Sequence, residues 1–259
     1  MPPTLTFDIE TIPDVPGLRR LYNAGPELSD HDVAEMALLF RRQQTGGSDF
    51  LPLHLQRVVV ISCALREGER FRVFSLAEPD AGEAEILRRF FDGIERYTPQ
   101  LVSWNGGGFD LPVLHYRAML HGIAAPRYWD LGDDDRDFKW NNYISRYHTR
   151  HLDLMDLLAL YQPRAYVPLD DFARLLGFPG KLGMDGAKVW EAYQRGEMAA
   201  IRDYCETDVV NTHLVFLRFQ RLRGVLTPQQ YEAEIALVRD TLAASDAAHW
   251  REFLTAWRA

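Results

Sequence analysis

The chain has few cysteines, no long apolar run and no excess of positive charge. Two of its 259 residues are cysteine, Cys63 and Cys205, and we expect two buried thiols rather than a disulfide-stabilised fold. The longest apolar stretches, such as 58–65, are far shorter than the roughly 20 residues that span a bilayer, so no transmembrane helix is expected. The first ten residues lack the basic and apolar regions of a signal peptide, which predicts a cytoplasmic protein.

The formal net charge of −8 argues against a long electrostatic contact with nucleic acid. Non-specific affinity grows with the number of phosphates that Lys and Arg neutralise. A short contact with nucleic acid is compatible with this charge, because acidic residues can serve a metal site while basic residues gather locally, as they do at 146–151. With 47% hydrophobic residues, the chain can bury a full core, and its length fits one catalytic domain with an appendage.

Hydrophobic periodicity predicts the order of strands and helices. Segment 4–10 alternates apolar and polar residues, which is typical of a strand with one apolar face. Further strands are expected at 57–65, 70–78 and 100–105, the first two forming a hairpin joined by 67–69. Helices are expected at 83–96, 110–122, 169–178, 196–224 and, as one more helix, from 227 onward. This order predicts an α/β fold, with a mixed sheet flanked by helices.

Two segments interrupt the pattern. Residues 14–53 contain a helix near 31–43, capped by Ser29 or Asp30, and we expect them to form a helical insertion that contacts a protein partner or covers the substrate. Residues 127–150 are polar, aromatic and weakly periodic, which predicts a long loop with short elements. We therefore divide the chain into a catalytic domain, 1–222, and a C-terminal helical extension, 223–259.

Three short motifs carry acidic residues. In the first, Asp8 and Glu10 share one strand face, about 7 Å apart at a rise of roughly 3.3 Å per residue. Two carboxylates held together need a cation, a bound proton or open water. Solvated acids on an edge strand are an alternative that this pair alone does not exclude.

The second motif, WNGGGFD at 104–110, places three glycines between a strand end and a helix start. Glycine lets backbone approach a substrate closely, and amides there can face an anion. Asp110 follows as a candidate metal ligand, although its position taken alone favours a cap for the helix that follows.

The third motif, YCETD at 204–208, lies in a helical stretch. Tyr204 and Asp208 are four residues apart and project from one face, as a simple surface pair also would. Asp203 and Glu206 point elsewhere and are expected to be solvated helix charges.

Together and in this order, FDIET, WNGGGFD and YCETD resemble the motifs of the DEDD superfamily of 3′–5′ exonucleases. A Tyr four residues before the last Asp is typical of the tyrosine branch, DEDDy, whereas the position of the histidine branch's His is Asp203. The segments LDDFARLLGF and LGFPGKLGMDGAKVW are most similar to predicted bacterial exonucleases related to the proofreading domain of family B DNA polymerases. The resemblance covers about residues 4–222.

This resemblance implies an RNase H-like fold and two divalent cations, Mg²⁺ or Mn²⁺. The implied ligands are Asp8, Glu10, Asp110 and Asp208. Such hard cations take oxygen ligands, and a pair about 4 Å apart suits an in-line displacement at phosphorus. Tyr204 would orient the attacking water, because an unperturbed phenol is a poor base near neutral pH. The implied activity releases nucleoside 5′-monophosphates from single-stranded or frayed 3′ ends, with DNA favoured over RNA.

Other residues are secondary candidates. Asn105 and Phe109 are expected to contact the terminal nucleotide, the phenyl ring by stacking on a base, although packing in a tight turn would also explain them. Lys181 and Lys188 flank a Gly-rich turn and either meet phosphate or are solvated. Asp153 and Asp156 lie near a strand or helix start and are expected to support the site, although a cap on the helix that follows 153 would explain Asp156 without function.

Two other functions use the same residues. A catalytically decayed nucleic-acid-binding module or partner subunit is one, but all four acids and Tyr204 are retained, and four unneutralised acids are a liability without metal. An endonuclease or RNase H-type enzyme would also use such carboxylates. The spacing of Tyr204 and Asp208 favours the exonuclease.

Overall fold

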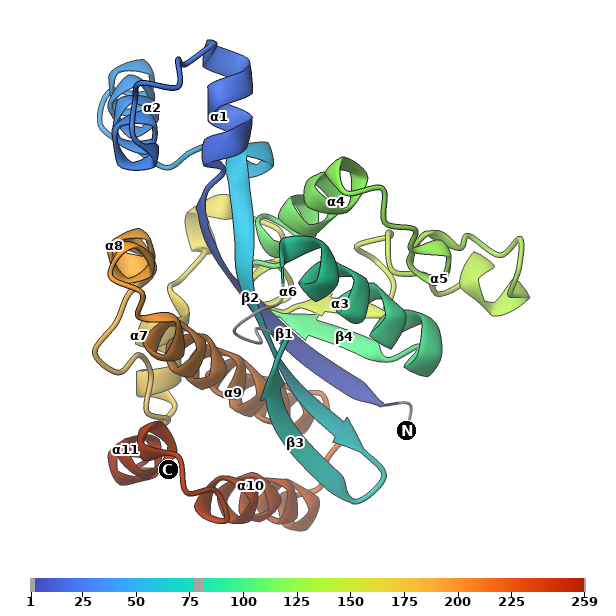
Figure 1. Ribbon diagram of the computed structural model, residues 1–259. Coiled ribbons are helices and arrows are strands. Elements are labelled where there is room, and N and C mark those ends of the chain that lie inside the picture. Colours follow the sequence, from blue (N-terminus) through green and yellow to red (C-terminus); the bar gives the residue numbers. More distant parts are fainter. Residues whose placement is uncertain (1–2, 77–81, 259) are drawn as a thin grey trace.

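A computed structural model describes residues 3–76 and 82–258 and places a five-stranded sheet between helices (Figure 1). The strands are β1 (Thr4–Pro13), β2 (Gln56–Glu67), β3 (Arg70–Ser75), β4 (Gln100–Ser103) and β5 (His151–Asp153). They lie in the order β3-β2-β1-β4-β5. β1 is antiparallel to β2 and parallel to β4, so the sheet is mixed. The expected α/β fold, with its RNase H-like arrangement, is confirmed.

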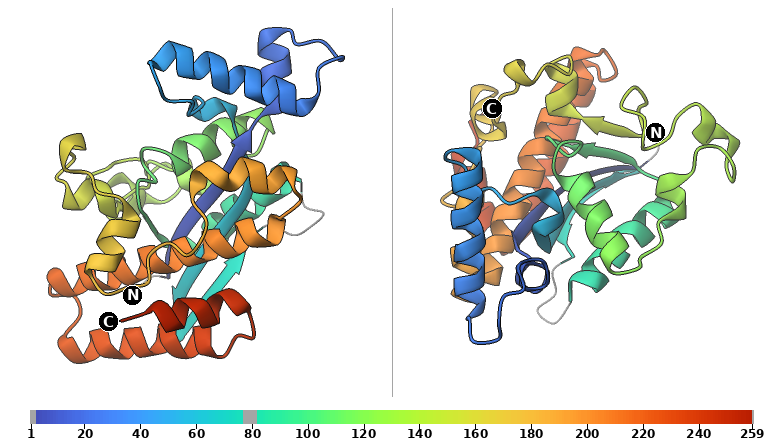
Figure 2. Two further views of the ribbon diagram at one scale, coloured as in Figure 1. Left: turned by 90° about the vertical axis from the view of Figure 1, so that its left-hand side faces the viewer. Right: turned by 90° about the horizontal axis from the view of Figure 1, so that it is seen from above.

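Helices cover both faces of this sheet (Figure 2). They are α1 (Val15–Tyr22), α2 (Asp30–Thr45), α3 (Glu83–Tyr97), α4 (Asp110–Leu120), α5 (Pro126–Trp129), α6 (Leu154–Leu158), α7 (Leu169–Leu175), α8 (Val189–Gln194), α9 (Met198–Leu222), α10 (Pro228–Ala243) and α11 (Ala248–Ala256). None of the helices in the described part of the chain is long and apolar enough to cross a bilayer.

The alternation in β1 sends its side chains to opposite faces. Leu5, Phe7 and Ile9 enter the core formed with α3 and α4. The intervening residues face α9, where the Oγ1 of Thr6 lies 3.0 Å from Nδ1 of His213. β1 runs three residues beyond the predicted strand, past a register shift between Glu10 and Thr11. The hairpin of β2 and β3 is confirmed, although β3 ends at Ser75 and residues 77–78 of the predicted strand lie outside the described residues.

The segment after β1 forms α1 and α2, which stand beyond one end of the sheet (Figure 1). Ser29 caps α2 in a capping box with Asp32, which confirms Ser29 rather than Asp30 as the cap. Seven buried apolar residues give these helices and the following segment their own small core: Val15, Leu18, Val33, Ala34, Ala37, Leu51 and Leu55. The insertion is therefore helical, as expected.

A buried ion-pair network fixes the base of the insertion. Arg117 on α4 places its guanidinium 2.5 Å from a carboxylate oxygen of Asp14 and 2.6 Å from one of Glu83. Glu83 also accepts a hydrogen bond from the backbone of Val58, at 2.8 Å. Since Asp14 begins the insertion, α3 and α4 hold its first residue in place.

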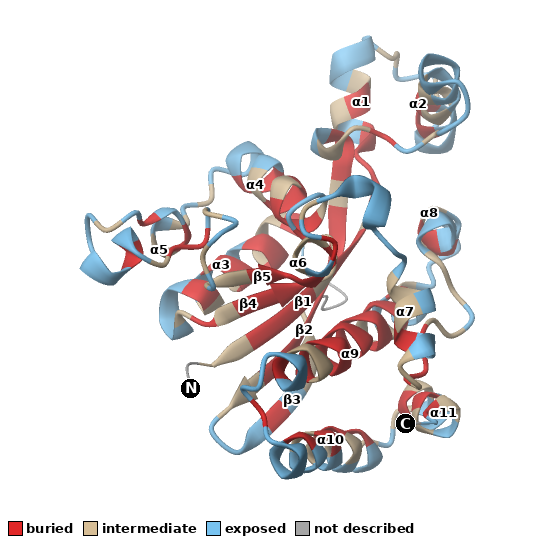
Figure 3. Cartoon of the chain, turned by 180° about the vertical axis from the view of Figure 1, so that it is seen from behind, coloured by how far each residue is buried: buried red, intermediate tan, exposed pale blue. Residues whose placement is uncertain are grey.

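Helix α9 is buried along most of its length (Figure 3). One core cluster joins its second half to α10 and α11, including Leu214, Ile235 and Phe253. The single helix expected from 227 onward is wrong, because the chain breaks after Ala243 and turns through 244–247 before α11. The hydroxyl of Ser245 accepts the amide of Ala247 in that turn, at 3.3 Å, a local bond that competes with helix continuation.

Candidate active site

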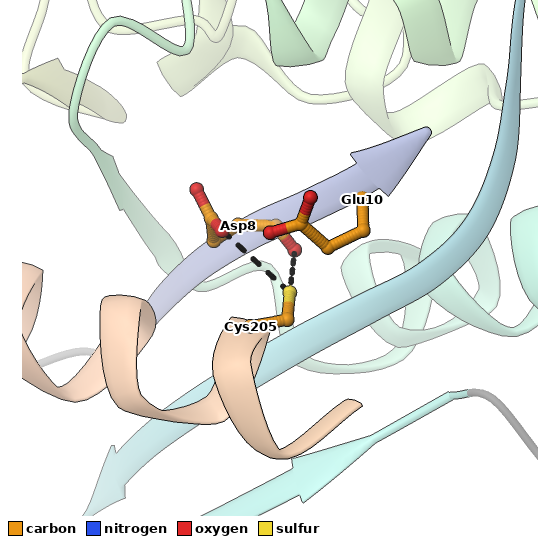
Figure 4. A group of neighbouring side chains, drawn as sticks. All are labelled: Asp8, Glu10 and Cys205. Carbon is orange, nitrogen blue, oxygen red and sulfur yellow. Dashed lines mark hydrogen bonds between the residues drawn. The ribbon is translucent and has the colours of Figure 1, made fainter. Parts of the chain in front are cut away.

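Asp8 and Glu10 lie side by side on β1, as their spacing predicts (Figure 4). One oxygen of each, together with the sulfur of Cys205 on α9, fall within 4.8 Å of one another. The thiol lies 3.5 Å from the backbone oxygen of Asp8 and 3.6 Å from its Oδ2. The alternative of solvated acids on an edge strand is wrong, because β1 is central in the sheet and Glu10 is buried. Both cysteines are buried and unpaired, as expected.

The glycine loop after β4 is folded around a carboxylate of the protein itself. The amides of Asn105 and Gly107 donate to Asp153, at 2.9 and 2.8 Å. Asn105 adopts a left-handed backbone, with a φ of 66°. At Gly106 a β-carbon would lie 2.3 Å from Oγ of Ser103, so only glycine fits there. Two of the amides that could face an external anion are thus occupied by Asp153.

Asp153 is also the N-cap of α6, accepting the amides of Met155 and Asp156 at 3.1 and 3.3 Å. The expectation that Asp156 is this cap is wrong. Asp153 ends β5, and a residue leaving a strand has the extended backbone that a cap requires. The sequence offers Asp153 as a residue that supports the site, but not as this cap.

Asp110 is the first residue of α4 and not its cap, which corrects the expectation from its position. Phe109 stands at the cap position without a capping side chain. The Oδ1 of Asp110 instead accepts the backbone amide of Ile9 on β1, at 3.2 Å. With 3% of its surface exposed, Asp110 is turned back toward the strand that carries Asp8.

Tyr204 and Asp208 face Lys181, which comes from the loop before α8. The ammonium nitrogen lies 2.5 Å from the phenolic oxygen and 3.4 Å from Oδ2 of Asp208. Tyr204 and Asp208 are both buried on α9, so the surface-pair alternative is wrong. Lys188, the other lysine that flanks the Gly-rich turn, pairs with Asp185 at 3.0 Å instead.

The charges around the site oppose ionisation of its acids. Burial, followed by the charges of Asp110 and Asp208, raises the pKa of Asp8 well above its usual value. Burial and the charge of Asp8 do the same for the pKa of Glu10. Burial raises the pKa of Asp110 to about 7 and that of Asp208 to about 6. The carboxylates of all three motifs therefore repel one another electrostatically, and the positive charge of Lys181 partly offsets this repulsion.

The remaining predicted residues lie around this cluster. Phe109 is half-buried, and its ring centroid is 5.7 Å from that of Phe50 in the insertion. Asn105 shapes the loop through its backbone, as described above.

Glu206 and Asp203 are not simply solvated charges, because α9 packs against β3 and α11. Glu206 accepts the hydroxyl of Ser75 at 2.7 Å, and its other oxygen lies 3.1 Å from Nε2 of His249. Asp203 lies 3.4 Å from Nδ1 of the same imidazole. The sequence spacing did not reveal the contacts of Lys181, Cys205 and His249. Each of these side chains meets its partners only through tertiary packing against α9 or β1.

The donor set fits divalent cations. The oxygens of Asp8 and Glu10 already lie close together, and among the described residues no donor pairs with the buried Oδ1 of Asp208. Buried carboxylate oxygens without donors are costly unless a cation neutralises them. Hard cations take such oxygen ligands.

Residues 48–257 match the model of a protein family described as predicted 3′-5′ exonuclease related to the exonuclease domain of PolB. This range includes Asp110, Tyr204 and Asp208 and begins after Asp8 and Glu10.

Curated relatives are DNA polymerases. The DNA polymerase of Archaeoglobus fulgidus is 26% identical over 136 residues, which are 51% of this chain and 17% of that polymerase. The catalytic subunit of DNA polymerase epsilon from Kluyveromyces lactis is 25% identical over 155 residues, 58% of this chain and 6% of the relative. The corresponding subunit of Dictyostelium discoideum is 37% identical over 70 residues, 27% of this chain and 3% of the relative. The chain spans a small part of each.

Proposed function

Because this chain belongs to the family of predicted 3′–5′ exonucleases related to the exonuclease domain of PolB, we propose that it hydrolyses phosphodiester bonds from the 3′ end of nucleic acid. The observation that carries the proposal is the convergence of carboxylates from three separate motifs beside β1, three of them buried and that of Asp8 half-buried. The four acids are Asp8, Glu10, Asp110 and Asp208. Such a cluster has no structural benefit, because each acid raises the cost of ionising its neighbours.

We assign the binding of two divalent cations, Mg²⁺ or Mn²⁺, to these four carboxylates. When bound, such a pair supplies electrostatic stabilisation of the attacking and leaving oxygens of an in-line displacement. The unpaired Oδ1 of Asp208 and the clustered oxygens of Asp8 and Glu10 support this assignment. Asp110 is held next to Asp8 by the bond that its Oδ1 accepts from the backbone amide of Ile9.

Tyr204 acts as a hydrogen-bond donor to the attacking water. Burial and the neighbouring carboxylates raise its pKa, so the phenol keeps its proton and does not serve as a base. Lys181 donates to the phenolic oxygen at 2.5 Å, which fixes the ring, while the hydroxyl hydrogen-bonds to Asp208 and becomes available to the water when Asp208 binds a cation. Lys181 also reduces the net negative charge that an approaching phosphate meets.

The substrate is a single-stranded or frayed 3′ end, with DNA favoured over RNA, and the product is a nucleoside 5′-monophosphate. The preference for DNA is supported by the relatives, which are DNA polymerases. Asn105 and Phe109 border the site and are proposed contacts for the terminal nucleotide. The contact of Phe109 with Phe50 supports a role for the insertion as a cover or as a surface for a protein partner.

We keep the division into a catalytic domain, 1–222, and a C-terminal extension, 223–259. In this division α10 and α11 support α9 from outside and contribute no ligand to the site.

The test is degradation of 5′-labelled single-stranded DNA and RNA by the wild type and by Asp8→Ala, with Mg²⁺, Mn²⁺ or EDTA. We expect a ladder that shortens from the 3′ end and disappears with EDTA or with the substitution. Comparison of the DNA and RNA ladders also shows which of the two nucleic acids the enzyme degrades. Tight binding without metal-dependent cleavage would instead identify a nucleic-acid-binding module.

A further inference from the structure

A pocket lies where β1 begins and β2 ends, at the end of the sheet away from Glu10 (Figure 1). It encloses about 400 Å³, which is within the range of small-molecule sites. None of the four acids of the cluster lines it. Thr4, which does line it, is four residues before Asp8, so the two positions are about 13 Å apart along β1. The pocket is therefore separate from the candidate active site.

One face of α9 forms the floor of this pocket. His213, Phe216, Leu217 and Gln220 all line it, and their spacing of three, four and seven residues places them on one side of the helix. Arg223, at the C-cap of α9, continues this row of side chains. The floor thus presents an imidazole, an apolar stretch, an amide and a guanidinium, in that order.

Two buried polar atoms on this floor lack partners. Nε2 of His213 and Oε1 of Gln220 make no hydrogen bond with any of the described residues. The two side chains belong to residues that are 0% and 8% exposed. An unpaired polar atom in such surroundings lowers stability, and a ligand with complementary groups would recover that loss. The two atoms therefore define what a ligand must offer.

The hydrogen-bonding role of the imidazole follows from its other nitrogen. Burial lowers the pKa of His213 to about 3, so the ring is neutral near pH 7. The hydroxyl of Thr6 lies 3.0 Å from Nδ1 and has no other hydrogen-bond partner in the described part of the chain, so it donates to Nδ1. The ring proton then lies on Nε2. The pocket thus offers a donor from His213 and an acceptor from Gln220.

The outer end of the row carries an available positive charge. Arg223 is exposed, its guanidinium lies 5.3 Å from the ring centroid of Phe219, and no carboxylate of residues 3–76 or 82–258 forms an ion pair with it. Arg66, the other arginine of the lining, is already paired with Glu234 at 2.6 Å. An anion can therefore bind Arg223 without displacing an existing ion pair.

We propose that this pocket binds a free nucleoside 5′-monophosphate. The base supplies an acceptor for Nε2 of His213 and a flat ring that packs against Phe216. A sugar hydroxyl donates to Oε1 of Gln220, and the phosphate binds Arg223. A fatty acid lacks the acceptor at its inner end and the donor for the amide, and inorganic phosphate alone leaves both buried atoms unpaired.

The ligand belongs to the class that the proposed reaction releases. Its meaning as a product therefore rests on the proposed function, whereas its binding does not. His213 also links the pocket to the cluster, because its Nδ1 contacts Thr6, two residues before Asp8, and because it follows Asp208 by five residues on α9. A mononucleotide in the pocket thus stabilises the pairing of β1 with α9, on which the first and third motifs depend.

Three variants test the pocket, with two matched controls. Gln220→Leu removes the acceptor at similar side-chain volume, and Arg223→Ala removes the cation. Val225→Trp, at a lining residue that is 40% exposed, fills the mouth. The controls are Arg221→Ala and Leu222→Trp, at exposed residues of the same segment that do not line this pocket. Circular dichroism and thermal melting establish that each variant is folded.

The measurement is isothermal titration calorimetry of the full chain in EDTA, which keeps cations from the carboxylates. Separate titrations use the 5′-monophosphates of adenosine and deoxyadenosine, the two nucleosides without phosphate, and inorganic phosphate. We expect the wild type to bind the monophosphates at one site, the nucleosides about tenfold more weakly, and inorganic phosphate not measurably. The two monophosphates show whether the site prefers the ribose or the deoxyribose form.

The variants have distinct expected effects. Gln220→Leu and Val225→Trp weaken monophosphate binding about tenfold or more. Arg223→Ala binds monophosphates no better than nucleosides, because the phosphate has lost its cation. Both controls stay within about twofold of the wild type.

The outcomes separate this proposal from the proposed function. If the wild type degrades DNA from the 3′ end but binds no monophosphate in EDTA, the pocket proposal is overturned and the exonuclease stands. Equal monophosphate binding by the wild type and the three pocket variants places the nucleotide elsewhere and also overturns it. Binding that depends on Gln220 and Arg223, in a chain that degrades no strand, supports the pocket and ends the proposed function.

Discussion

The ammonium group of Lys181 lies 2.5 Å from the phenolic oxygen of Tyr204, beside the carboxylates of Asp8, Glu10 and Asp208. The same ammonium group lies 3.4 Å from Oδ2 of Asp208, so one side chain contacts both Tyr204 and Asp208 of the third motif. Burial lowers the pKa of Lys181, but the charges of Asp208, Asp8 and Glu10 together outweigh burial and raise that pKa above its usual value. The loop that precedes α8 therefore contributes to the site as directly as the three motifs do.

Replacing Lys181 should lower activity without abolishing metal binding. Lys181→Met removes the donor that fixes the Tyr204 phenol, and we expect turnover to fall about 10- to 100-fold, the range for a lost positioning or electrostatic group. Lys188→Met is the control, because Lys188 pairs with Asp185 away from the cluster. Single-turnover degradation of labelled DNA measures both. Equal rates for Lys181→Met and wild type would contradict the role of Lys181.

Neutralising one buried acid should stabilise the metal-free protein while it inactivates the enzyme. Asp110→Asn retains an oxygen that accepts the Ile9 amide but removes a charge from the cluster. We expect cleavage to fall at least about 1,000-fold, and the free energy of unfolding in EDTA to rise by about 1 kcal/mol or more. Urea unfolding measures this, with the exposed Asp133→Asn as control. A loss of stability in Asp110→Asn would show that the carboxylates do not repel one another in the folded protein.

The metal-free protein should become more stable as the pH falls from 8 to 5. The folded-state pKa values of Asp110 and Asp208, about 7 and about 6, lie above the usual value near 3.8. These two carboxyl groups, with Asp8 and Glu10, whose pKa values are also raised, bind more protons in the folded state, and unfolding becomes harder as pH decreases. The buried imidazoles of His115, His151 and His213, whose pKa values burial lowers, act in the opposite direction, but they are three groups against four. We expect a higher melting temperature at pH 5.5 than at pH 8 in EDTA.

Saturating Mn²⁺ should reverse this order by stabilising the charged form at pH 8, with about 2.7 kcal/mol gained at 100 times the dissociation constant. A melting temperature that rises with pH in EDTA would contradict the prediction.

The ion-pair network at Arg117 should be essential for stability. Arg117→Met keeps much of the side-chain volume but leaves Asp14 and Glu83 buried without their cation, which costs about 3–5 kcal/mol. Arg88→Ala, at an exposed pair with Glu85 on α3, should change stability by less than about 1 kcal/mol. Urea unfolding at neutral pH compares them, and similar midpoints for the two variants would refute the difference.

The insertion should be removable without loss of the fold. The amide of Asp14 donates to the carbonyl of Leu55 at 2.9 Å, so a short Gly-Ser linker in place of 15–53 can close the gap. Retaining Asp14 keeps the pair with Arg117. We expect Mn²⁺ to raise the melting temperature as in wild type, while degradation slows about fivefold or more because Phe109 loses its contact with Phe50. Unchanged degradation and assembly would end the proposed role of the insertion.

The sequence predicted four of the five strands and the long helix, because each depends on local spacing, but it missed the three-residue strand β5. Asp8 and Glu10 share a strand face by the two-residue repeat, and Tyr204 and Asp208 share a helix face by the four-residue repeat. Local spacing does not determine the direction in which the side chain of Asp110 points. It depends on the amide of Ile9, which lies 101 residues earlier in the chain.

Residues that act through tertiary contacts escaped the sequence analysis for the same reason. Glu206 has the pattern of an exposed helix residue, yet β3 and α11 enclose it between Ser75 and His249. Asp153 looks like a generic strand end, and only the fold brings the amides of Asn105 and Gly107 to it. A single sequence predicts which residues share a helix face, but it does not predict which other elements pack against that face.

The pairing of β1 with α9 also has a consequence for how the protein is made. Thr6 and His213 are in contact across 207 positions of sequence, and Cys205 reaches Asp8 across 197. Closing such long loops is slow, and it requires that both segments exist. During synthesis on the ribosome, the first strand must wait for α9 before the acids of the first and third motifs can meet. A nascent chain that ends before α9 therefore lacks Asp208 and holds no assembled cluster.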